Sequence, residues 1–446
     1  MKLRIFWNNL LTSVWLRPLL WILAIFVLAV VLLRIDTVLL ETKVVLTAPW
    51  IFIDSGEGAR TILGALATTL LTVAALAFSV LMLAVVQTAN AYSPRVLREY
   101  LEDAGNQNVL GILLGTFLYT LLVLRRVQDT EASVFIPTVS VSVALVLSII
   151  SVLFFIYFIN HVALSIQVPS IVRRIHEEAE EMLQHLFPDG VGRPWTGTGE
   201  PPLPQGEPLQ LLARRSGYVA TVAGDTLLQA ARARGAVLRL EKTVGEYVFR
   251  GGLLVTVWPG GGELDEELAE TVHGAISLRD ERTTFQDLNF GLQQLTDVAL
   301  RAISPAVNDP RTVVHCLNAA GALLVDLASR GPVSPYRLDE SGALRLIAWG
   351  PDLKSALDTA LLQLHPYLMV DPYVVRRLLD IYVELAASVG TEAGRALVAE
   401  HLARIAFLAG EHVQSPWDRE ALNERLAGAA RNLQRPVEGF LLETGS

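Results

Sequence analysis

Residues 61–93 read TILGALATTLLTVAALAFSVLMLAVVQTANAYS and carry no charged side chain; the nearest charges on either side are Arg60 and Arg95. An α-helix needs about 20 mainly apolar residues to cross a bilayer, so a helix of this length either tilts or protrudes. Pro94 disfavours helical geometry in the residue before it, which ends the run. The stretch predicts a membrane-spanning helix, around which the rest of the chain is organised.

One face of this helix is small and mildly polar. Hydroxyl side chains recur at spacings of seven, four and seven residues, which returns each of them to the same side of a helix, with alanines between them. Leu70, Val73 and Leu81 lie on the opposite face and suit lipid. We call the polar set, with the glutamine further along, the hydroxyl stripe: Thr61, Thr68, Thr72, Ser79 and Gln87.

The hydroxyl stripe has two interpretations. Small and hydroxyl residues in a membrane helix most often pack against another helix, because they allow close approach and bond across the interface. In a homo-oligomer, the same face would line a water-filled path. Where the helix leaves the membrane, the sequence predicts a hinge or gate at Tyr92, Ser93, Pro94 and Arg95.

Three further uncharged runs predict three more spans. The first span is retained rather than cleaved, because no convincing small-residue cleavage site follows it and tryptophans flank it like an interfacial belt. The third contains Gly111 and Gly115 in a GxxxG spacing, which lets two helices approach closely. The fold class is therefore an α-helical integral membrane protein with a transmembrane domain over residues 1–172 and four spans, at about 15–33, 62–90, 108–124 and 134–160.

Charge distribution sets the expected orientation. Four spans place both termini on one side, where seven Lys and Arg residues lie near the span ends against five on the other side. Positive residues favour the cytoplasmic side, so the termini and the soluble region are predicted to be cytoplasmic. Residues 161–446 hold 26 basic and 36 acidic residues, so we expect no nucleic-acid partner.

The soluble region is predicted to be α+β. Residues 173–208 are expected to form a stalk helix and a linker rich in proline and glycine, and residues 209–262 a small β domain with Val- and Leu-rich strands. Everything after Asp265 reads as amphipathic helices, so residues 263–446 predict a helical bundle.

One motif in the helical region reads as a helix stop followed by a helix start. Ser304-Pro305 ends one helix, and Asn308-Asp309-Pro310 begins the next, with Asp309 as N-cap and Pro310 in the first turn. Asp297 and Arg301 are four residues apart and are expected to pair. A stop and a cap explain this spacing without a ligand.

Motifs for catalysis, metals and cofactors are missing from the sequence. The histidines show no HxxxH or HExxH spacing, and Cys316 is the single cysteine, so no disulfide or thiolate-rich metal site can form within the chain. His315 and Cys316 are adjacent, yet neighbours on a helix point about 100° apart. We therefore expect no enzymatic activity and no cofactor. The span cores hold no Asp, Glu, Lys or Arg, and His161 lies only at the end of the fourth, which disfavours ion-coupled transport.

The chain also resembles a known family in several of the residues named above. The matching runs are FSV at 78–80 with Gln87, YSPR at 92–95, NQNVLGILLGTFLYTLLVLR at 106–125 and ALRAISPAVNDPRTVVHCLN at 299–318. They resemble the bacterial predicted membrane proteins called domain of unknown function 2254. The resemblance implies an inner-membrane protein and carries no activity, substrate or cofactor. Its family-like positions are Gln87, Ser93, Pro94, Arg95, Arg301, Ser304, Pro305, Asn308, Asp309 and Pro310.

Two functions fit these observations. In the first, the chain forms a homo-oligomeric channel or passive conduit, since four spans are too few to enclose a sizeable path alone, and the cytoplasmic domain gates it. In the second, the spans anchor a sensor or scaffold whose soluble domain binds a small molecule or protein. In both, the lipid bilayer is a partner and a homo-oligomer is expected.

Overall fold

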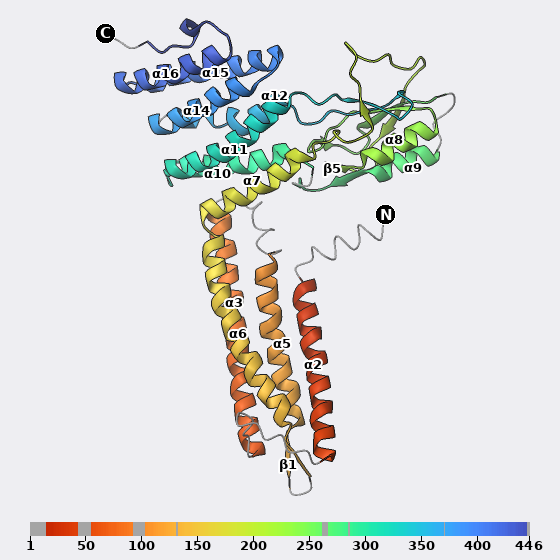
Figure 1. The fold of residues 1–446 in the computed structure, drawn as a ribbon, viewed down its shortest axis with the longest axis vertical. Coiled ribbons are helices and arrows are strands. Elements are labelled where there is room, and N and C mark those ends of the chain that lie inside the picture. The colour runs from red at the N-terminus through yellow and green to blue at the C-terminus, as the bar shows by residue number, and fades with distance from the viewer. Residues whose placement is uncertain are drawn as a thin grey trace. The chain divides into compact units, whose positions relative to one another are not determined.

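The computed structural model divides the chain into two compact units, Met1–Ser170 and Ile171–Ser446 (Figure 1). The predicted hinge of Tyr92, Ser93, Pro94 and Arg95 falls outside the residues that the structure describes. Those residues are 15–42, 55–91, 103–130, 133–260, 266–283, 286–369 and 371–443.

The first unit is built of long helices. Their bounds are α2 (Leu16–Glu41), α3 (Gly56–Ala91), α5 (Ala104–Arg126) and α6 (Thr138–Ser165). Each extends beyond its predicted span at one or both ends, because a helix continues past the apolar run while its backbone hydrogen bonds are satisfied. The start of α6 is later than predicted, since β1 (Gln128–Thr130) pairs with β2 (Ser133–Phe135) in an antiparallel hairpin before it.

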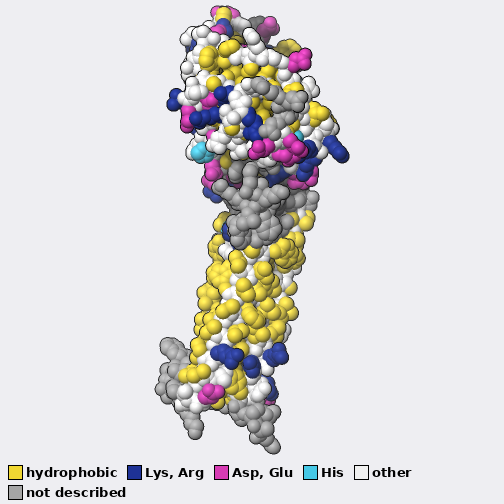
Figure 2. Space-filling model, turned by 90° about the vertical axis from the view of Figure 1, so that its right-hand side faces the viewer, with side chains coloured by type: hydrophobic (Ala, Val, Ile, Leu, Met, Phe, Trp, Pro, Cys, Tyr) yellow, Lys and Arg dark blue, Asp and Glu magenta, His cyan; other side chains and the backbone are white. Residues whose placement is uncertain are grey.

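α5 is the central helix of this unit. It contacts α2, α3 and α6, and it is the most buried of the four. Apolar side chains also cover most of the outside of the unit on the face shown in Figure 2, with a group of Lys and Arg side chains near one end. A helix bundle that is apolar inside and outside is typical of a membrane domain.

Five helices in the described ranges are long and apolar enough to cross a membrane. Four are α2, α3, α5 and α6, with mean hydropathies of 1.8 to 2.8. The fifth is α11 (Pro310–Arg330), with a mean hydropathy of 1.4, in the second unit. Length and composition alone therefore support several spans without fixing their number at four.

The second unit begins with α7 (Val168–Gln184), most of which belongs to it, and contains two sheets. The larger sheet has the strand order β3-β10-β11-β6-β8-β4, and the smaller β7-β5-β9. The strands of the larger are β3 (Arg193–Pro194), β4 (Leu209–Leu212), β6 (Val237–Leu240), β8 (Leu253–Trp258), β10 (Tyr336–Leu338) and β11 (Leu344–Ile347). Those of the smaller are β5 (Gly217–Val222), β7 (Tyr247–Val248) and β9 (Ile276–Arg279).

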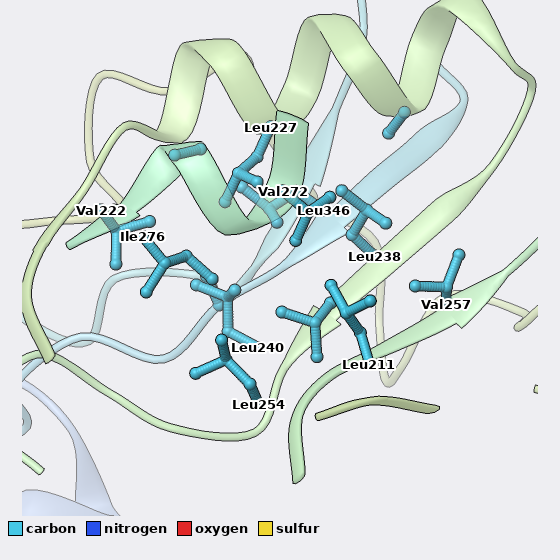
Figure 3. Packing of buried hydrophobic residues seen from close by; sticks show 14 of the residues in the cluster. Leu211, Val222, Leu227, Leu238, Leu240, Leu254, Val257, Val272, Ile276 and Leu346 are labelled. Atoms are coloured by element: carbon cyan, nitrogen blue, oxygen red, sulfur yellow. The ribbon is translucent and has the colours of Figure 1, made fainter. Parts of the chain in front are cut away.

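Helices α8 (Gly224–Ala233) and α9 (Glu266–Ala275) pack with these sheets around one hydrophobic core. Figure 3 shows Leu227 and Val272 pointing toward Leu238 and Leu346 of the larger sheet. Full burial of a leucine side chain contributes about 2 kcal/mol, so this cluster supplies much of the driving force for folding the β region.

The expectation that everything after Asp265 is helical is wrong. β9 pairs with β5, and β10 and β11 join the larger sheet from a position between two helices of the bundle. β11 pairs in parallel with β6, placing Leu346 beside Leu238. β3, the edge strand that pairs with β10, comes from the predicted linker. These strands have two to four residues each. They are stabilised by pairing with strands distant in the sequence, so no local pattern predicts them.

The rest of the second unit is helical. Its elements are α10 (Leu288–Ile303), α11, α12 (Leu353–Leu357), the π-helix η2 (Asp358–Leu362), α13 (His365–Leu368), α14 (Pro372–Ser388), α15 (Glu392–His412), α16 (Pro416–Asn432) and the 3-10 helix η3 (Val437–Gly439). The predicted stop and start are confirmed: α10 ends before Ser304, and α11 begins at Pro310. Asp309 caps α11 by accepting hydrogen bonds from the backbone N–H groups of Arg311 and Thr312.

Candidate functional site

The hydroxyl stripe lies on the outside of the four-helix unit. Thr61, Thr68, Thr72, Ser79 and Gln87 are all exposed along α3. No other described helix of the same chain covers them, so the chain does not pack this face against itself. If the stripe has a protein partner in the membrane, that partner is another molecule.

The opposite face of α3 is buried, and the expectation that it contacts lipid is wrong. Leu70 and Leu81 are only 3% and 4% exposed and pack in one cluster with Leu113 of α5 and Phe158 of α6. Val73 packs partly buried against the same cluster. The buried face combines these leucines with alanines, of which Ala74 and Ala77 belong to the same cluster, so α3 packs closely against α5 and α6 through small and large side chains together.

Each hydroxyl of the stripe is hydrogen-bonded to its own helix. The O–H groups of Thr61, Thr68, Thr72 and Ser79 donate to the backbone carbonyls four residues earlier, at 2.8 to 3.0 Å. This local bond satisfies the donor, while the lone pairs of the oxygen remain on the surface as acceptors. The stripe can therefore face lipid at low cost, and it can also accept hydrogen bonds from water.

Gly111 and Gly115 bring α5 against α2 of the same chain. A Cβ added to Gly111 would lie 2.8 Å from Cα of Pro18 and 2.9 Å from Cβ of Trp21, and one on Gly115 would lie 2.7 Å from Cδ1 of Ile25. Such contacts leave no room for a side chain. The GxxxG spacing thus serves packing inside one chain.

A buried carboxylate ties α2 to the start of α6. Asp36, which is 3% exposed, accepts hydrogen bonds from the backbone N–H groups of Val139 and Ser140 at 3.0 Å and from the Ser140 hydroxyl at 2.5 Å. It is the N-terminal cap of a helix remote in sequence, where a negative charge also opposes the helix dipole favourably. The Tyr119 hydroxyl of α5 donates to the Ser140 carbonyl and joins a third helix to this point.

The other end of α5 carries a second polar contact. Asp103 caps α5 through the Asn106 N–H and lies 3.0 Å from Nε2 of His161 in α6, whose ring stacks on Tyr157. Between these ends, two apolar clusters fill most of the interior, and the buried Ser151 hydroxyl of α6 donates to the Thr116 hydroxyl of α5 at 3.1 Å. The interior of a single chain is therefore packed. The hydroxyl stripe is a polar feature on the outside of the unit.

The motif from Asp297 to Pro310, at the junction of α10 and α11, does not gather into one pocket. Asp309 is bonded within its own turn, also accepting the Thr312 hydroxyl at 2.6 Å, and these bonds lower the pKa of its carboxyl. Asn308 adopts a left-handed backbone with φ 48° to make the turn between the helices. The pairing of Asp297 with Arg301 stays a prediction. These residues behave as a helix connection.

A buried polar cluster in the helical part escaped the sequence reasoning. Nε2 of His401 in α15 lies 3.3 Å from Oδ1 of Asp358 in η2, and the Tyr382 hydroxyl of α14 lies 3.4 Å from Nδ1 of His401. The ring centroid of His365 in α13 is 6.2 Å from that of His401. Lys354 pairs with the outer oxygen of Asp358 at 2.5 Å. Lys354 and Asp358 are four residues apart, but Asp358, His365, Tyr382 and His401 come from separate helices, so no sequence spacing connects those four.

The π-helix that carries Asp358 is held by α10. The buried Thr296 hydroxyl lies 3.0 Å from the Ala360 carbonyl and 3.3 Å from the Thr359 carbonyl, inside η2. π-turns are rare and often mark functional sites, because their wider bonding leaves carbonyls to be satisfied from elsewhere. The signal that sequence reasoning could have used is weak: one threonine on the buried face of α10.

Burial favours the neutral form of the two histidines in this cluster. It lowers the pKa of His365 from 6.5 to about 3, with His401 and Arg404 adding to the effect, and it lowers the pKa of His401 despite Asp358. Burial likewise raises the pKa of the Cys316 thiol to about 12, so this cysteine is not a thiolate at neutral pH. Within the described ranges, no group of three or more His, Cys, Asp or Glu residues could hold a metal ion.

Comparison with known proteins places these features in a wider set. A family model described as "Predicted membrane protein (DUF2254)" matches residues 12–384. Similar curated proteins include the uncharacterised proteins Rv1290c of Mycobacterium tuberculosis and Mb1321c of Mycobacterium bovis, each 31% identical over 388 residues, 85% of this chain and 73% of the relative. No solved structure matches. The matched region includes the hydroxyl stripe, the glycine pair and the Asp309 turn.

Proposed function

The chain belongs to the family of predicted membrane proteins called domain of unknown function 2254, and on that premise we propose that it forms a homo-oligomeric passive conduit. Its spans are α2, α3, α5 and α6, and the 171–446 unit gates the path. The single observation that carries the proposal is the hydroxyl stripe, exposed on the outside of a unit whose interior is packed.

Four spans are favoured over five because α11 has a polar side. Arg311, His315, Asn318 and Asp326 are exposed along it, whereas its apolar side packs with α10 and α14. A helix with a stripe of this kind belongs to a soluble bundle. With four spans, both termini lie on one side, and the bias of Lys and Arg near the span ends supports the cytoplasm of a bacterial cell for that side and the inner membrane for the spans.

The dimensions of the stripe suit a path across the bilayer. From Thr61 to Ser79 it extends for about 27 Å along a helix that rises 1.5 Å per residue, close to the roughly 30 Å of hydrocarbon. Assembly of several copies with this face inward would surround a channel with hydroxyl oxygens, which accept hydrogen bonds from water. The face has no ionisable group, so the proposed conduit couples to no proton or ion gradient, and the proposal includes no enzymatic activity.

Cysteine accessibility tests this proposal. Thr72→Cys should react with a membrane-impermeant thiol reagent in liposomes, since water reaches a channel wall. Leu71→Cys, the matched control, is exposed on the same helix but turned from the stripe toward lipid, and it should not react. The native Cys316 is 1% exposed and gives a low background.

Ion flux from wild-type protein in tight liposomes completes the test. Protection of both cysteines together with zero flux would contradict the conduit and leave the stripe as a surface for helix packing between molecules.

A second function, a membrane-anchored sensor or scaffold, is favoured by one observation. The cluster of Asp358, His365, Tyr382 and His401 places polar groups in the interior of the helical part, next to a π-turn. Such a site suits a conformational response to a ligand. Liposomes without flux, combined with a Thr296→Val variant that keeps its melting temperature but loses binding to a partner, would favour this function.

A further inference from the structure

The outer face of the smaller sheet carries a row of aromatic and basic side chains. Tyr218 of β5 pairs directly with Tyr247 of β7 on one side and with Arg279 of β9 on the other. Residues directly opposite each other in antiparallel strands point to the same face. Tyr247 and Arg279 are exposed and Tyr218 is half-buried, so this face is turned to the surroundings.

A third aromatic side chain extends the row. The Phe249 ring packs edge-on against Tyr247 at 5.1 Å, and Tyr247 packs edge-on against Tyr218 at 4.9 Å. Phe249 is nevertheless 71% exposed and Tyr247 40% exposed. We call Tyr218, Tyr247, Phe249, Arg250 and Arg279 the aromatic face.

The exposure of Phe249 is built into an ordered turn. The backbone N–H groups of Gly251 and Gly252 donate to the carbonyls of Ala213 and Phe249, both at 2.8 Å, and the Arg250 N–H donates to the Ser216 hydroxyl at 2.9 Å. Gly251 has φ +80°, which a side chain would strain. Because three hydrogen bonds from backbone N–H groups fix this turn, the phenyl ring stays exposed.

The charges around the aromatic face favour an anionic partner. In the described ranges, Arg250 and Arg279 pair with no carboxylate. Of the nearby acidic residues, Asp280 is paired with Arg215 at 2.6 Å and Glu246 with Lys242 at 3.2 Å. Glu281 is exposed and has no ion-pair partner in the described ranges, so two unpaired arginines stand against one unpaired carboxylate. The guanidinium groups of Arg279, which lies opposite Tyr218, and of Arg250, which follows Phe249 in the chain, thus stay available to an anion.

We propose that the aromatic face docks on the surface of an anionic lipid bilayer. The amphipathic tyrosine rings enter the headgroup region, where such rings are enriched, the phenylalanine ring reaches the acyl boundary, and the arginines attract anionic headgroups. A bilayer is available as the partner because the chain belongs to a membrane protein family. The aromatic face is covalently linked to the membrane helices, so it meets lipid at a high effective concentration.

The size of the face argues against a second copy as its occupant. Three aromatic side chains of about 200 Å² each, exposed to these extents, offer about 300 Å² of apolar surface. A stable protein interface covers about 800 Å² per partner. A shallow contact with lipid needs no such area, since it is supported by covalent attachment to the membrane helices.

The test places an environment-sensitive fluorophore at Phe249→Cys in full-length protein, one copy per nanodisc. In nanodiscs of one-third phosphatidylglycerol and two-thirds phosphatidylcholine, emission should shift to shorter wavelength, and brominated lipid should quench it. Phe407→Cys is the matched control: a 66% exposed phenylalanine on α15, it should keep the emission of a label in water. Emission from position 249 that equals the control in nanodiscs overturns the proposal.

Two further measurements decide the lipid chemistry. Arg250→Glu with Arg279→Glu, or nanodiscs of phosphatidylcholine alone, should reduce the wavelength shift; an unchanged shift would overturn the anionic part of the proposal. Hydroxyl-radical footprinting of wild-type protein, which needs no variant, should show protection of Tyr247 and Phe249 in nanodiscs but not in detergent. Protection in detergent that increases with protein concentration would assign the face to a second copy and overturn lipid docking.

Discussion

His401 lies between Asp358 and Tyr382, with Nε2 3.3 Å from the carboxylate and Nδ1 3.4 Å from the hydroxyl. Asp358 therefore lies within ion-pair distance of one ring nitrogen, and the Tyr382 hydroxyl within hydrogen-bonding distance of the other. Neither ring nitrogen of the neighbouring His365 has a hydrogen-bond partner within the described residues, and the side chain is fully buried.

His365→Phe should make the second unit less sensitive to acid. The unfolded chain binds a proton at this histidine near pH 6.5, whereas burial holds the folded pKa at about 3. The stability that depends on a neutral His365 is therefore fully present above pH 6.5 and is lost as the pH falls from 6.5 toward 3. Between pH 7 and 5, the wild type should lose about 2 kcal/mol more than the variant in free energy of unfolding.

The readout is the reactivity of the buried Cys316 in increasing urea, at pH 7 and pH 5, in the full-length protein. Lys354, Glu400 and Arg404 also act on His401, but they remain in both proteins. His412→Phe replaces an exposed histidine of α15 and should keep the wild-type response to acid. An acid response of His365→Phe equal to that of the wild type would show that another group titrates.

Gly111→Ala should destabilise the four-helix unit by about 1–3 kcal/mol, as overpacking does. The added methyl group would lie 2.8 Å from the α2 backbone at Pro18, which cannot move aside as a flexible side chain could. Gly64→Ala on α3 is the control, since a Cβ there meets nothing within 4 Å. Thermal melting in detergent should separate the two variants, and equal melting temperatures would show that α2 and α5 do not pack as described.

Asp309→Ala should lower the free energy of unfolding of the second unit by about 1 kcal/mol, because α11 loses its N-cap. The control, Asp326→Ala, removes a half-exposed carboxylate from the same helix away from its start and should cost less. Urea unfolding measures both. If function is lost while the unfolding curve is unchanged, the turn at Asn308 and Asp309 has a binding role instead.

Ser79→Leu should reduce ion flux through the proposed conduit, since a leucine from every copy would add an apolar constriction to the path. Phe78→Leu changes the next residue, which is exposed but turned away from the stripe, and should leave the flux unchanged. Flux is measured in liposomes at equal protein content. Equal flux from the two variants would place the path, if there is one, away from α3.

The sequence alone determined the features that depend on neighbouring residues. An uncharged run such as 61–93 must be helical in lipid, because every backbone polar group there needs a partner within the chain. The start of α11 is equally local, since the Asp309 side chain reaches only the first N–H groups of the helix that follows. The GxxxG spacing of Gly111 and Gly115 also predicted close packing against another helix, but it did not identify α2 as that helix.

Tertiary structure alone decided which side of each element is used. The stripe pattern places Thr72 and Leu70 on different faces of α3, but only the packing of α5 and α6 turns Leu70 inward and leaves Thr72 outside. Leu346 belongs to a sheet because Leu238, over one hundred residues earlier, offers it a strand to pair with. Asp358 and His401 meet because their helices pack together. Contacts of this kind depend on the free energy of the whole fold, which no local spacing in the sequence records.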